Sequence, residues 1–207
     1  MGYWADDCDA SGSACDARGG HGPATGAQPR RPARPPRRDR APCGVRGGWG
    51  GGLAAYRDTY EEWREFILGY LAWETANVTA VCLRDGDRVV GTTTLGDFDL
   101  ANGSAHIGWT AYAPEVWGTR VNAETKRLLL GTAFDHGFER VKLQADVLNE
   151  RSRAAILRLG ATFEGVLRHT QPRADGTWRD TAVYSVLREE WPAVRDGLDA
   201  RLAAQTA

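Results

Sequence analysis

The residues whose spacing most clearly suggests chemistry are W-G-T-R-V-N, residues 117–122, which lead into the first turn of an expected helix. A tight turn at Gly118 would leave the first N–H groups of that helix without partners inside the helix. Together with the helix dipole, these donors form a site suited to a phosphate group. A glycine before a helix is more often an ordinary turn, so this loop alone does not decide between the two interpretations.

The elements that must hold this loop alternate between helices and strands from about residue 53 onward. Apolar residues at three- and four-residue steps predict an amphipathic helix from Leu53 to about Trp73. The patterns that follow predict strands at 78–83, 88–96 and 104–112, a helix from 121 to near Gly137, a strand at 141–147, a short helix at 150–159, strands at 161–170 and 178–187, and a helix at 189–202. R-D-G-D and A-D-G-T read as turns between strands. This order predicts an α/β domain with a mixed sheet.

Three details of these helices are also predicted. The apolar face of the helix from residue 121 should contain Val121, Thr125, Leu128, Leu129, Thr132 and Ala133. Asn149 is a suitable N-cap for the short helix. Pro192 is tolerated in the first turn of the last helix.

Residues 1–52 differ in composition and predict a low-complexity, disordered tail in front of a domain at 53–207. They contain six of the nine prolines and almost no Leu, Ile, Val or Phe, so they cannot bury enough apolar surface to fold. Their eight Arg against five Asp could contact nucleic-acid phosphates nonspecifically. The other 155 residues carry 18 basic and 22 acidic side chains, which argues against nucleic acid as the main partner.

The remaining composition points to a cytoplasmic protein without metal or membrane. No apolar run approaches the roughly 20 residues of a membrane helix, and the acidic start lacks the features of a secretory signal. The four cysteines, Cys8, Cys15, Cys43 and Cys82, form no C-x-x-C pair. We therefore expect neither a metal site nor a disulfide framework.

Several motifs in order resemble the GNAT superfamily of N-acetyltransferases, in particular its RimJ/RimL-like branch. The matching stretches are H-I-G-W-T, P-E-V-W-G-T-R-V-N-A-E-T-K-R-L-L-L, L-N-E-R-S-R-A-A-I-L-R-L-G-A-T-F-E-G-V-L-R and D-G-T-W-R-D-T-A-V-Y-S-V-L-R-E-E-W-P. The resemblance covers about residues 53–205 and is dense from Ile107 onward. It implies a mostly antiparallel central sheet with a splayed strand pair, flanked by helices, and acetyl-CoA as co-substrate.

The resemblance also assigns cofactor contacts. In that family the loop before the long helix holds the CoA pyrophosphate through backbone amides, which here are those of Trp117, Gly118, Thr119, Arg120, Val121 and Asn122. The strands on either side, 104–112 and 141–147, would part to admit the pantetheine arm. Asn149 and Ser152 lie where relatives contact the cofactor near its thioester. Asn149 can serve as a helix cap only, or fill both roles.

The implied reaction is attack of a neutral primary amine, a protein N-terminal α-amine or a small-molecule amine, on the thioester carbonyl. Backbone N–H groups near residues 107–109 would stabilise the oxyanion. His106 is the best-placed base, because relatives commonly carry Glu there and His titrates in the useful range; the alternative is a surface or packing histidine. Ser152 could protonate the leaving thiolate, since Ile156 stands where many relatives have Tyr.

His169 and Tyr184, on the last two strands, could line the acceptor site, with packing as the alternative for each. Glu115 and Arg120 depart from the family pattern, which favours Gln or Arg at the first position and a small residue at the second. Nothing in residues 1–52 resembles the first strand and helix of relatives. These departures leave open a catalytically silent acyl-CoA-binding protein. Relatives often dimerise, so a homodimer is also possible.

Overall fold

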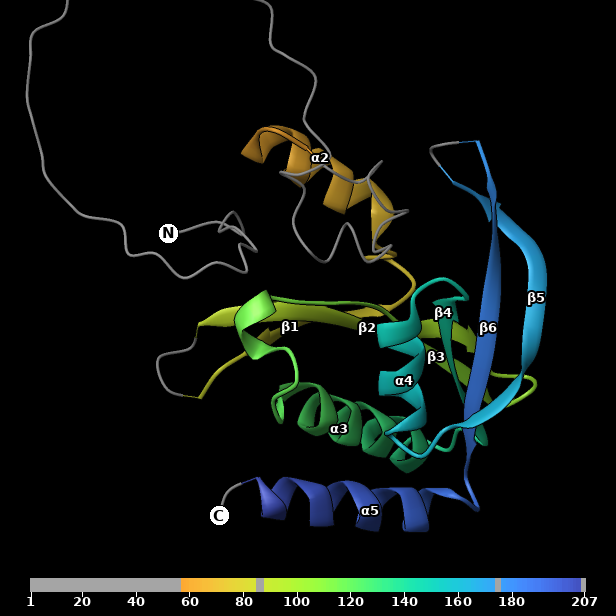
Figure 1. Ribbon diagram of the computed structural model, residues 1–207. Coiled ribbons are helices and arrows are strands. Elements are labelled where there is room, and N and C mark those ends of the chain that lie inside the picture. The colour runs from red at the N-terminus through yellow and green to blue at the C-terminus, as the bar shows by residue number, and fades with distance from the viewer. Residues whose placement is uncertain (1–56, 85–87, 174–175, 206–207) are drawn as a thin grey trace, which may run out of the picture.

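The computed structural model describes residues 57–84, 88–173 and 176–205 (Figure 1). The elements in chain order are α2 (Tyr60–Tyr70), β1 (Asn77–Cys82), β2 (Val89–Asp99), β3 (Ser104–Tyr112), the one-turn helix η3 (Pro114–Val116), α3 (Val121–Asp135), β4 (Arg140–Asp146), α4 (Glu150–Leu157), β5 (Thr162–Pro172), β6 (Trp178–Leu187) and α5 (Trp191–Ala204). Apart from η3, this is the predicted order. The tail at 1–52, Leu53, and the turn residues 85–87 and 174–175 lie outside the described residues.

One six-stranded sheet, in the order β1-β2-β3-β4-β6-β5, forms the centre of the described structure. Every neighbouring pair is antiparallel except β3 and β4, which are parallel. The parallel pair is possible because α3 connects the end of β3 to the start of β4 as a crossover. The predicted mixed, mostly antiparallel α/β fold is therefore confirmed.

The helices lie on both sides of this sheet. In Figure 1, α3 and α5 lie together on one side, α2 lies on the other side, and α4 lies beside β4. None of the described helices is long and apolar enough to cross a bilayer.

The core fills the space between the sheet and the pair α3 and α5. Its largest members include Leu95, Ile107, Leu130, Phe134, Leu143, Tyr184, Trp191 and Leu198. On each strand these residues alternate with residues of the opposite face, as the two-residue period of a strand requires. Burying one such large side chain stabilises a fold by about 1.5–3 kcal/mol. The same alternation places His106 of β3 and Lys142 of β4 on the other face.

Helix α2 is shorter than the sequence pattern predicts. It begins after Thr59, whose hydroxyl accepts from the backbone N–H of Glu62, while the Glu62 carboxylate accepts from the N–H of Thr59. This capping box fixes the start of the helix. The helix ends at Tyr70 rather than Trp73 because Leu71 has extended backbone angles. The predicted bounds were therefore too wide for the part that the structure describes.

The predicted buried face of α3 is correct only in part: Ala133 is buried and Leu129 packs against the core, but Thr132 is exposed. The residues that face the core are Ala123, Lys126, Leu130, Gly131, Ala133 and Phe134, whereas Leu128 is 60% exposed. The error has a physical cause. Lys126 lies in the middle of the buried face, and because lysine is polar, the apolar residues of the sequence suggest a face turned away from the true one. The helix ends before Gly137, which has φ +92°, as predicted.

Candidate active site

Strands β3 and β4 separate after three residue pairs. The parallel pairing runs from Ser104 opposite Arg140 to His106 opposite Lys142 and stops there. Beyond that point β3 continues to Tyr112 alongside β2, and β4 continues to Asp146 alongside β6. The two strands therefore part in the middle of the sheet, with His106 and Lys142 at the point of separation, as the splayed-strand prediction requires.

The loop that follows β3 lies at the start of α3. Gly118 has φ +74°, a left-handed conformation that glycine adopts at little cost. The indole Nε1 of Trp117 donates to the carbonyl of Tyr112 at 3.0 Å, which ties the loop to the end of β3. The hydroxyl of Thr119 donates to the carbonyl of Val116 at 2.7 Å. These bonds fix the path of the loop into the helix.

The backbone amides of this loop are partly committed to the loop itself. Those of Trp117, Thr119 and Val121 donate to acceptors within it. Within the described residues, the structure gives no protein acceptor for the amides of Gly118 and Asn122, nor for that of Ala123. Unpaired donors at a helix N-terminus form an anion site. The predicted loop therefore carries donors for a phosphate group, although three of its six predicted amides are already bonded within the protein.

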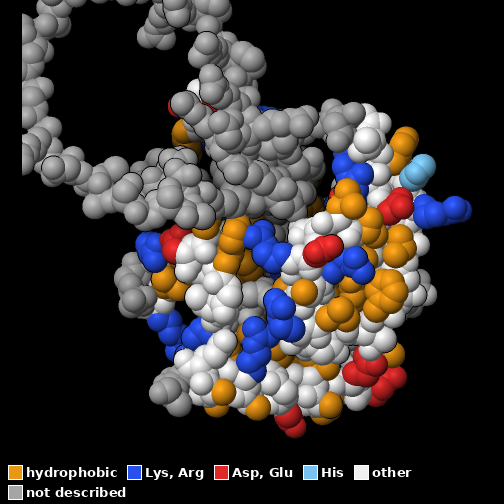
Figure 2. All heavy atoms as spheres, viewed as in Figure 1, with side chains coloured by type: hydrophobic (Ala, Val, Ile, Leu, Met, Phe, Trp, Pro, Cys, Tyr) orange, Lys and Arg blue, Asp and Glu red, His pale blue; other side chains and the backbone are white. Residues whose placement is uncertain are grey.

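Two arginines lie around this loop. Arg120 is placed along the helix, with its Nε 3.2 Å from a Glu124 carboxylate oxygen. The guanidinium carbon of Arg151, on α4, lies 3.6 Å from the centroid of the Trp117 ring, within cation–π distance. Arg151 thus links α4 to the loop that precedes α3. Figure 2 shows several Lys and Arg side chains on this face of the molecule, a distribution that favours an anionic ligand.

His106 lies on the opposite face of β3 from the core and is 3% exposed. Its Nδ1 is 2.9 Å from a carboxylate oxygen of Asp97, and the Nζ of Lys142 is 3.7 Å from the same oxygen. Asp97 has φ +48° in an irregular stretch of β2, beyond residue 96 where the predicted strand ends. The three side chains therefore meet where β3 and β4 part.

The surroundings of His106 keep its ring neutral. Burial, and next the positive charge of Lys142, lower the pKa of His106 to about 4, although Asp97 acts in the opposite direction. Since the Asp97 carboxylate accepts from Nδ1–H, the lone pair is on Nε2. Nε2 is buried and has no hydrogen-bond partner among the residues that the structure describes. The ring lies over Gly108, because a Cβ built there would be 2.8 Å from Nε2. His106 therefore offers an unoccupied acceptor directed along the part of β3 that has left β4.

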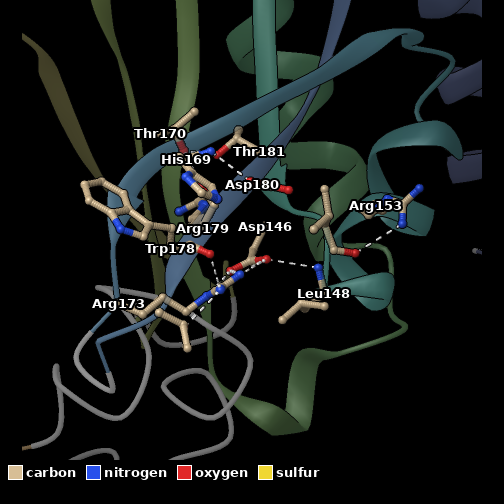
Figure 3. Close-up of polar contacts among 12 residues, drawn as sticks. Asp146, Leu148, Arg153, His169, Thr170, Arg173, Trp178, Arg179, Asp180 and Thr181 are labelled. Atoms are coloured by element: carbon tan, nitrogen blue, oxygen red, sulfur yellow. Dashed lines mark hydrogen bonds and ion pairs between the residues drawn. The ribbon is translucent and has the colours of Figure 1, made fainter.

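On the β4 side, the loop from Asp146 to Asn149 is held by two sets of hydrogen bonds. Asp146 accepts from the backbone N–H of Leu148 at 2.9 Å and forms a bidentate ion pair with Arg173, with contacts of 2.8 to 3.1 Å (Figure 3). Arg173 also donates to the carbonyl of Trp178 at 2.6 Å. The hairpin of β5 and β6 thereby fixes the start of α4.

Asn149 caps α4 as predicted. Its side-chain oxygen accepts from the backbone N–H of Ser152 at 3.0 Å. The predicted cap and Ser152 are therefore brought together at the open end of the separated strands. Their predicted contacts with the cofactor, and the proton transfer assigned to Ser152, stay predictions.

The other predicted residues lie elsewhere. Tyr184 is 1% exposed in the core, where its hydroxyl accepts from Arg153 at 3.3 Å. His169 lies on the edge strand β5, stacks on Trp178 with ring centroids 5.7 Å apart, and donates its backbone N–H to Asp180 (Figure 3). The structure does not bring these two side chains together with His106. Their contact with an acceptor is untested and stays a prediction.

Sequence reasoning did not identify Asp97, Lys126 or Arg151. Asp97 follows a glycine at an irregular point of β2, where strand alternation gives no signal. Lys126 lies three residues after Ala123 and four before Leu130 on one face of the helix, but a lysine is not expected on a buried face. Nothing in the sequence places Arg151 over Trp117, since the contact depends on how α4 lies beside the loop.

The comparisons with known proteins agree with this geometry. The family of acetyltransferase (GNAT) domains matches residues 46–162. The chain is 32% identical over 140 residues to "Putative ribosomal N-acetyltransferase YdaF" of Bacillus subtilis, covering 65% of this chain and 72% of that protein. It is 38% identical to a solved "putative acetyltransferase" from T. thermophilus, with a TM-score of 0.66, covering 72% of this chain and 78% of that one.

A more distant solved structure shares the fold. The microcin C7 self-immunity acetyltransferase MccE, solved in complex with acetyl-CoA and AMP, has a TM-score of 0.53 and 22% identity, covering 63% of this chain and 72% of that one. The family match includes more than half of the chain and begins a few residues before the predicted domain start. The chain therefore belongs to the GNAT acetyltransferase family and is an acyltransferase.

Proposed function

We propose that this protein transfers the acetyl group of acetyl-CoA to a primary amine, and that its acceptor is a protein N-terminal α-amine. The observation that carries the proposal is the parting of β3 and β4 beyond His106 and Lys142, next to a helix start with unpaired amides. The thioester of acetyl-CoA can lie between the separated strands while the pyrophosphate of the same molecule is held by the backbone amides of Gly118, Asn122 and Ala123. MccE, which shares the fold, was solved with acetyl-CoA bound.

In the proposed reaction the amine nitrogen attacks the thioester carbonyl carbon, and the carbonyl π electrons move onto the oxygen. Main-chain donors of β3 at residues 107–109, where the strand has left β4, stabilise this oxyanion. The proton on nitrogen passes to Nε2 of His106. The carbonyl re-forms as the carbon–sulfur bond breaks. The thiolate takes a proton from solvent, either directly or relayed through the Ser152 hydroxyl, which regains its own proton from solvent as His106 releases one.

The acidity of His106 limits the acceptors that this site can use. A base with a pKa of about 4 deprotonates neither a lysine ammonium, whose pKa is about 10.4, nor an α-ammonium, so the acceptor has to arrive as a neutral amine. An α-amine has a pKa near 8, so roughly a tenth of it is already neutral at pH 7. His106 then only has to accept the more acidic proton of the tetrahedral adduct. One relative carries the name "Putative ribosomal N-acetyltransferase YdaF", and by that likeness the proposal extends to a RimJ/RimL-like enzyme with a protein acceptor.

The test compares two synthetic peptides in an assay of CoA thiol release. One peptide has a free N-terminus and no lysine, and the other has a blocked N-terminus and one internal lysine. We expect thiol release with the first peptide that requires both acetyl-CoA and peptide, and mass spectrometry should find one added acetyl group at the N-terminus. Equal or faster reaction of the lysine peptide would contradict the acceptor assignment. The absence of transfer to any peptide or small amine would contradict the reaction itself.

The second candidate is a protein that binds acetyl-CoA without turnover. The observation that favours it is Ile156, which is 7% exposed in the core at the position where many relatives carry a tyrosine. Thermal stabilisation by acetyl-CoA without thiol release from any acceptor would support this candidate. Any measurable acetyl transfer would exclude it.

A further inference from the structure

Lys126 is a lysine enclosed in the interior beneath the sheet. It lies on α3 and is 5% exposed. Its Nζ is 3.0 Å from the hydroxyl of Thr93 on β2 and 2.6 Å from the hydroxyl of Thr110 on β3, and the two hydroxyls are 2.8 Å apart. Within the described ranges, no carboxylate oxygen lies within ion-pair distance of this amine.

Such a lysine does not stabilise the fold. An amine transferred from water into an apolar interior loses hydration, and two neutral hydroxyls do not replace a counter-charge. The loss shows in the lowered pKa of Lys126, about 7, which results from burial. A methionine of similar length would fill the same space without this penalty. The amine therefore has to be explained by something other than stability.

The amine lies at an irregular point of the strand that borders the candidate active site. The register between β2 and β3 shifts between Thr92 and Thr94, and Trp109 has φ +48°. Positive φ is unfavourable for a tryptophan and needs support from its surroundings. Thr93 and Thr110 lie beside this bulge on the side of α3, where Lys126 bonds to both. The amine thus joins the helix to both strands at the bulge.

A chain of hydrogen bonds leads from the amine to the backbone of the bulge. The hydroxyl of Thr110 donates to the carbonyl of Gly108 at 3.3 Å. Because Thr110 uses its hydroxyl proton in this bond, its oxygen can accept hydrogen bonds from the Lys126 amine and from the Thr93 hydroxyl. The amine and both hydroxyls therefore all have hydrogen-bond partners. The carbonyl of Gly108 belongs to the peptide plane between Gly108 and Trp109. The ring of His106 lies against the α-carbon of the same Gly108, on the other face of β3.

We propose that Lys126 is a positioning residue for acetyl transfer: with Thr93 and Thr110 it holds the bulge at Gly108 and Trp109 in the conformation that aligns His106 with the space between β3 and β4. This inference rests on the proposed function and adds a residue that touches neither substrate. This network of Lys126, Thr93 and Thr110 is polar at a buried position where apolar side chains would stabilise the fold more. The lower stability accompanies a fixed conformation of the bulge.

The variant Lys126→Met tests the proposal because the two roles predict opposite results. If Lys126 positions the bulge, we expect an unchanged or higher melting temperature at pH 7, a kcat reduced at least tenfold, and a dissociation constant for acetyl-CoA within about threefold of the wild-type value. A merely structural lysine would lower the melting temperature and leave kcat unaltered. Unchanged kcat in a folded Lys126→Met protein would overturn the proposal.

The variant Thr110→Val provides a second and independent test. It removes the hydroxyl that links the amine to Gly108 and keeps the shape of the side chain. We expect a reduced kcat in this variant as well. The double variant Lys126→Met with Thr110→Val should lose no more than about twofold beyond Lys126→Met, because both changes break one chain of bonds. Multiplicative losses would show that the two residues act separately and would contradict the proposal.

Leu130→Ala is the matched control. Leu130 is fully buried one turn further along α3 and belongs to the hydrophobic core. The control should lower the melting temperature and keep kcat within about twofold of wild type. A comparable loss of kcat in Leu130→Ala would mean that turnover follows general destabilisation, against the proposal. If the wild-type protein itself transfers no acetyl group, the proposed function fails. If the wild-type protein is active but Lys126→Met and Thr110→Val keep its kcat, only this inference fails.

Discussion

Replacing Lys126 with methionine should change how the stability of this protein depends on pH. The amine is enclosed and its pKa is lowered to about 7 in the folded protein, compared with 10.5 as the ordinary value. Between these two values the unfolded chain carries a proton on Lys126 that the folded chain does not. The free energy of unfolding therefore rises with pH across this window, by up to about 1.4 kcal/mol per pH unit for this one group.

From pH 7 to pH 9 the expected gain for the wild-type protein is about 2 kcal/mol from Lys126, because the amine is only half protonated at the lower end. Two other buried groups, His106 and Tyr112, titrate outside this range. The pKa of His106 is about 4, and burial raises the pKa of Tyr112 to about 12. Lys126→Met has no amine to titrate at this position. The amount by which its free energy of unfolding exceeds that of the wild-type protein should therefore shrink by about 2 kcal/mol from pH 7 to pH 9.

The assay is urea denaturation of both proteins at pH 7 and pH 9 at one ionic strength, followed by tryptophan fluorescence. Groups shared by both proteins cancel in the difference between them. Leu130→Ala is the control, since it should lower the free energy of unfolding by the same amount at both pH values, about 2–5 kcal/mol. A difference between wild type and Lys126→Met that is equal at pH 7 and pH 9 would refute the burial argument for this amine.

Three further variants follow from the site. Because desolvation lowers the pKa of His106, the unfolded chain binds a proton there more readily than the folded one, so the wild-type protein should lose stability as pH falls from 6.5 toward 4. His106→Gln should reduce this loss in acid denaturation, and it should lower kcat by about 10²-fold. Gly118→Ala meets no atom within 4 Å but forces a left-handed φ of +74°, which costs about 1–2 kcal/mol, so calorimetry should show weaker acetyl-CoA binding by roughly tenfold. Asn149→Ala should cost about 1 kcal/mol of stability, measured by thermal unfolding, whereas Asn149→Asp should keep most of it.

The order of helices and strands could be predicted because their signals are local. The turn at Gly118 and the cap at Asn149 each involve residues close together in the sequence. The separated strands could be expected only from the resemblance to a family, since strand pairing joins residues about 35 apart, such as His106 and Lys142. Local patterns do not carry that information.

What could not be predicted depends on exceptions to those patterns. Asp97 reaches His106 only because β2 continues through an irregular stretch after Gly96, where alternation fails. The predicted core face of α3 omits Lys126, because lysine is almost never fully buried without a partner. That rule moved the predicted face and concealed the network with Thr93 and Thr110. The position that breaks the rule is also the one with an unusual chemical environment, as expected where a sequence departs from a local rule for functional reasons.

The two buried bases on opposite faces of β3 lead to one last expectation. His106 is neutral above about pH 4 and Lys126 above about pH 7, while an α-amine acceptor becomes neutral near pH 8. Stability and turnover should therefore rise together from pH 7 to pH 9, with turnover at subsaturating peptide rising about tenfold as the neutral fraction of the α-amine grows. In Lys126→Met this relative rise in turnover should persist, because it belongs to the acceptor, while the rise in stability should largely disappear. Initial rates and unfolding curves on the same samples separate the two effects, and a variant in which both rises vanish would show that Lys126 itself controls the pH dependence of the reaction.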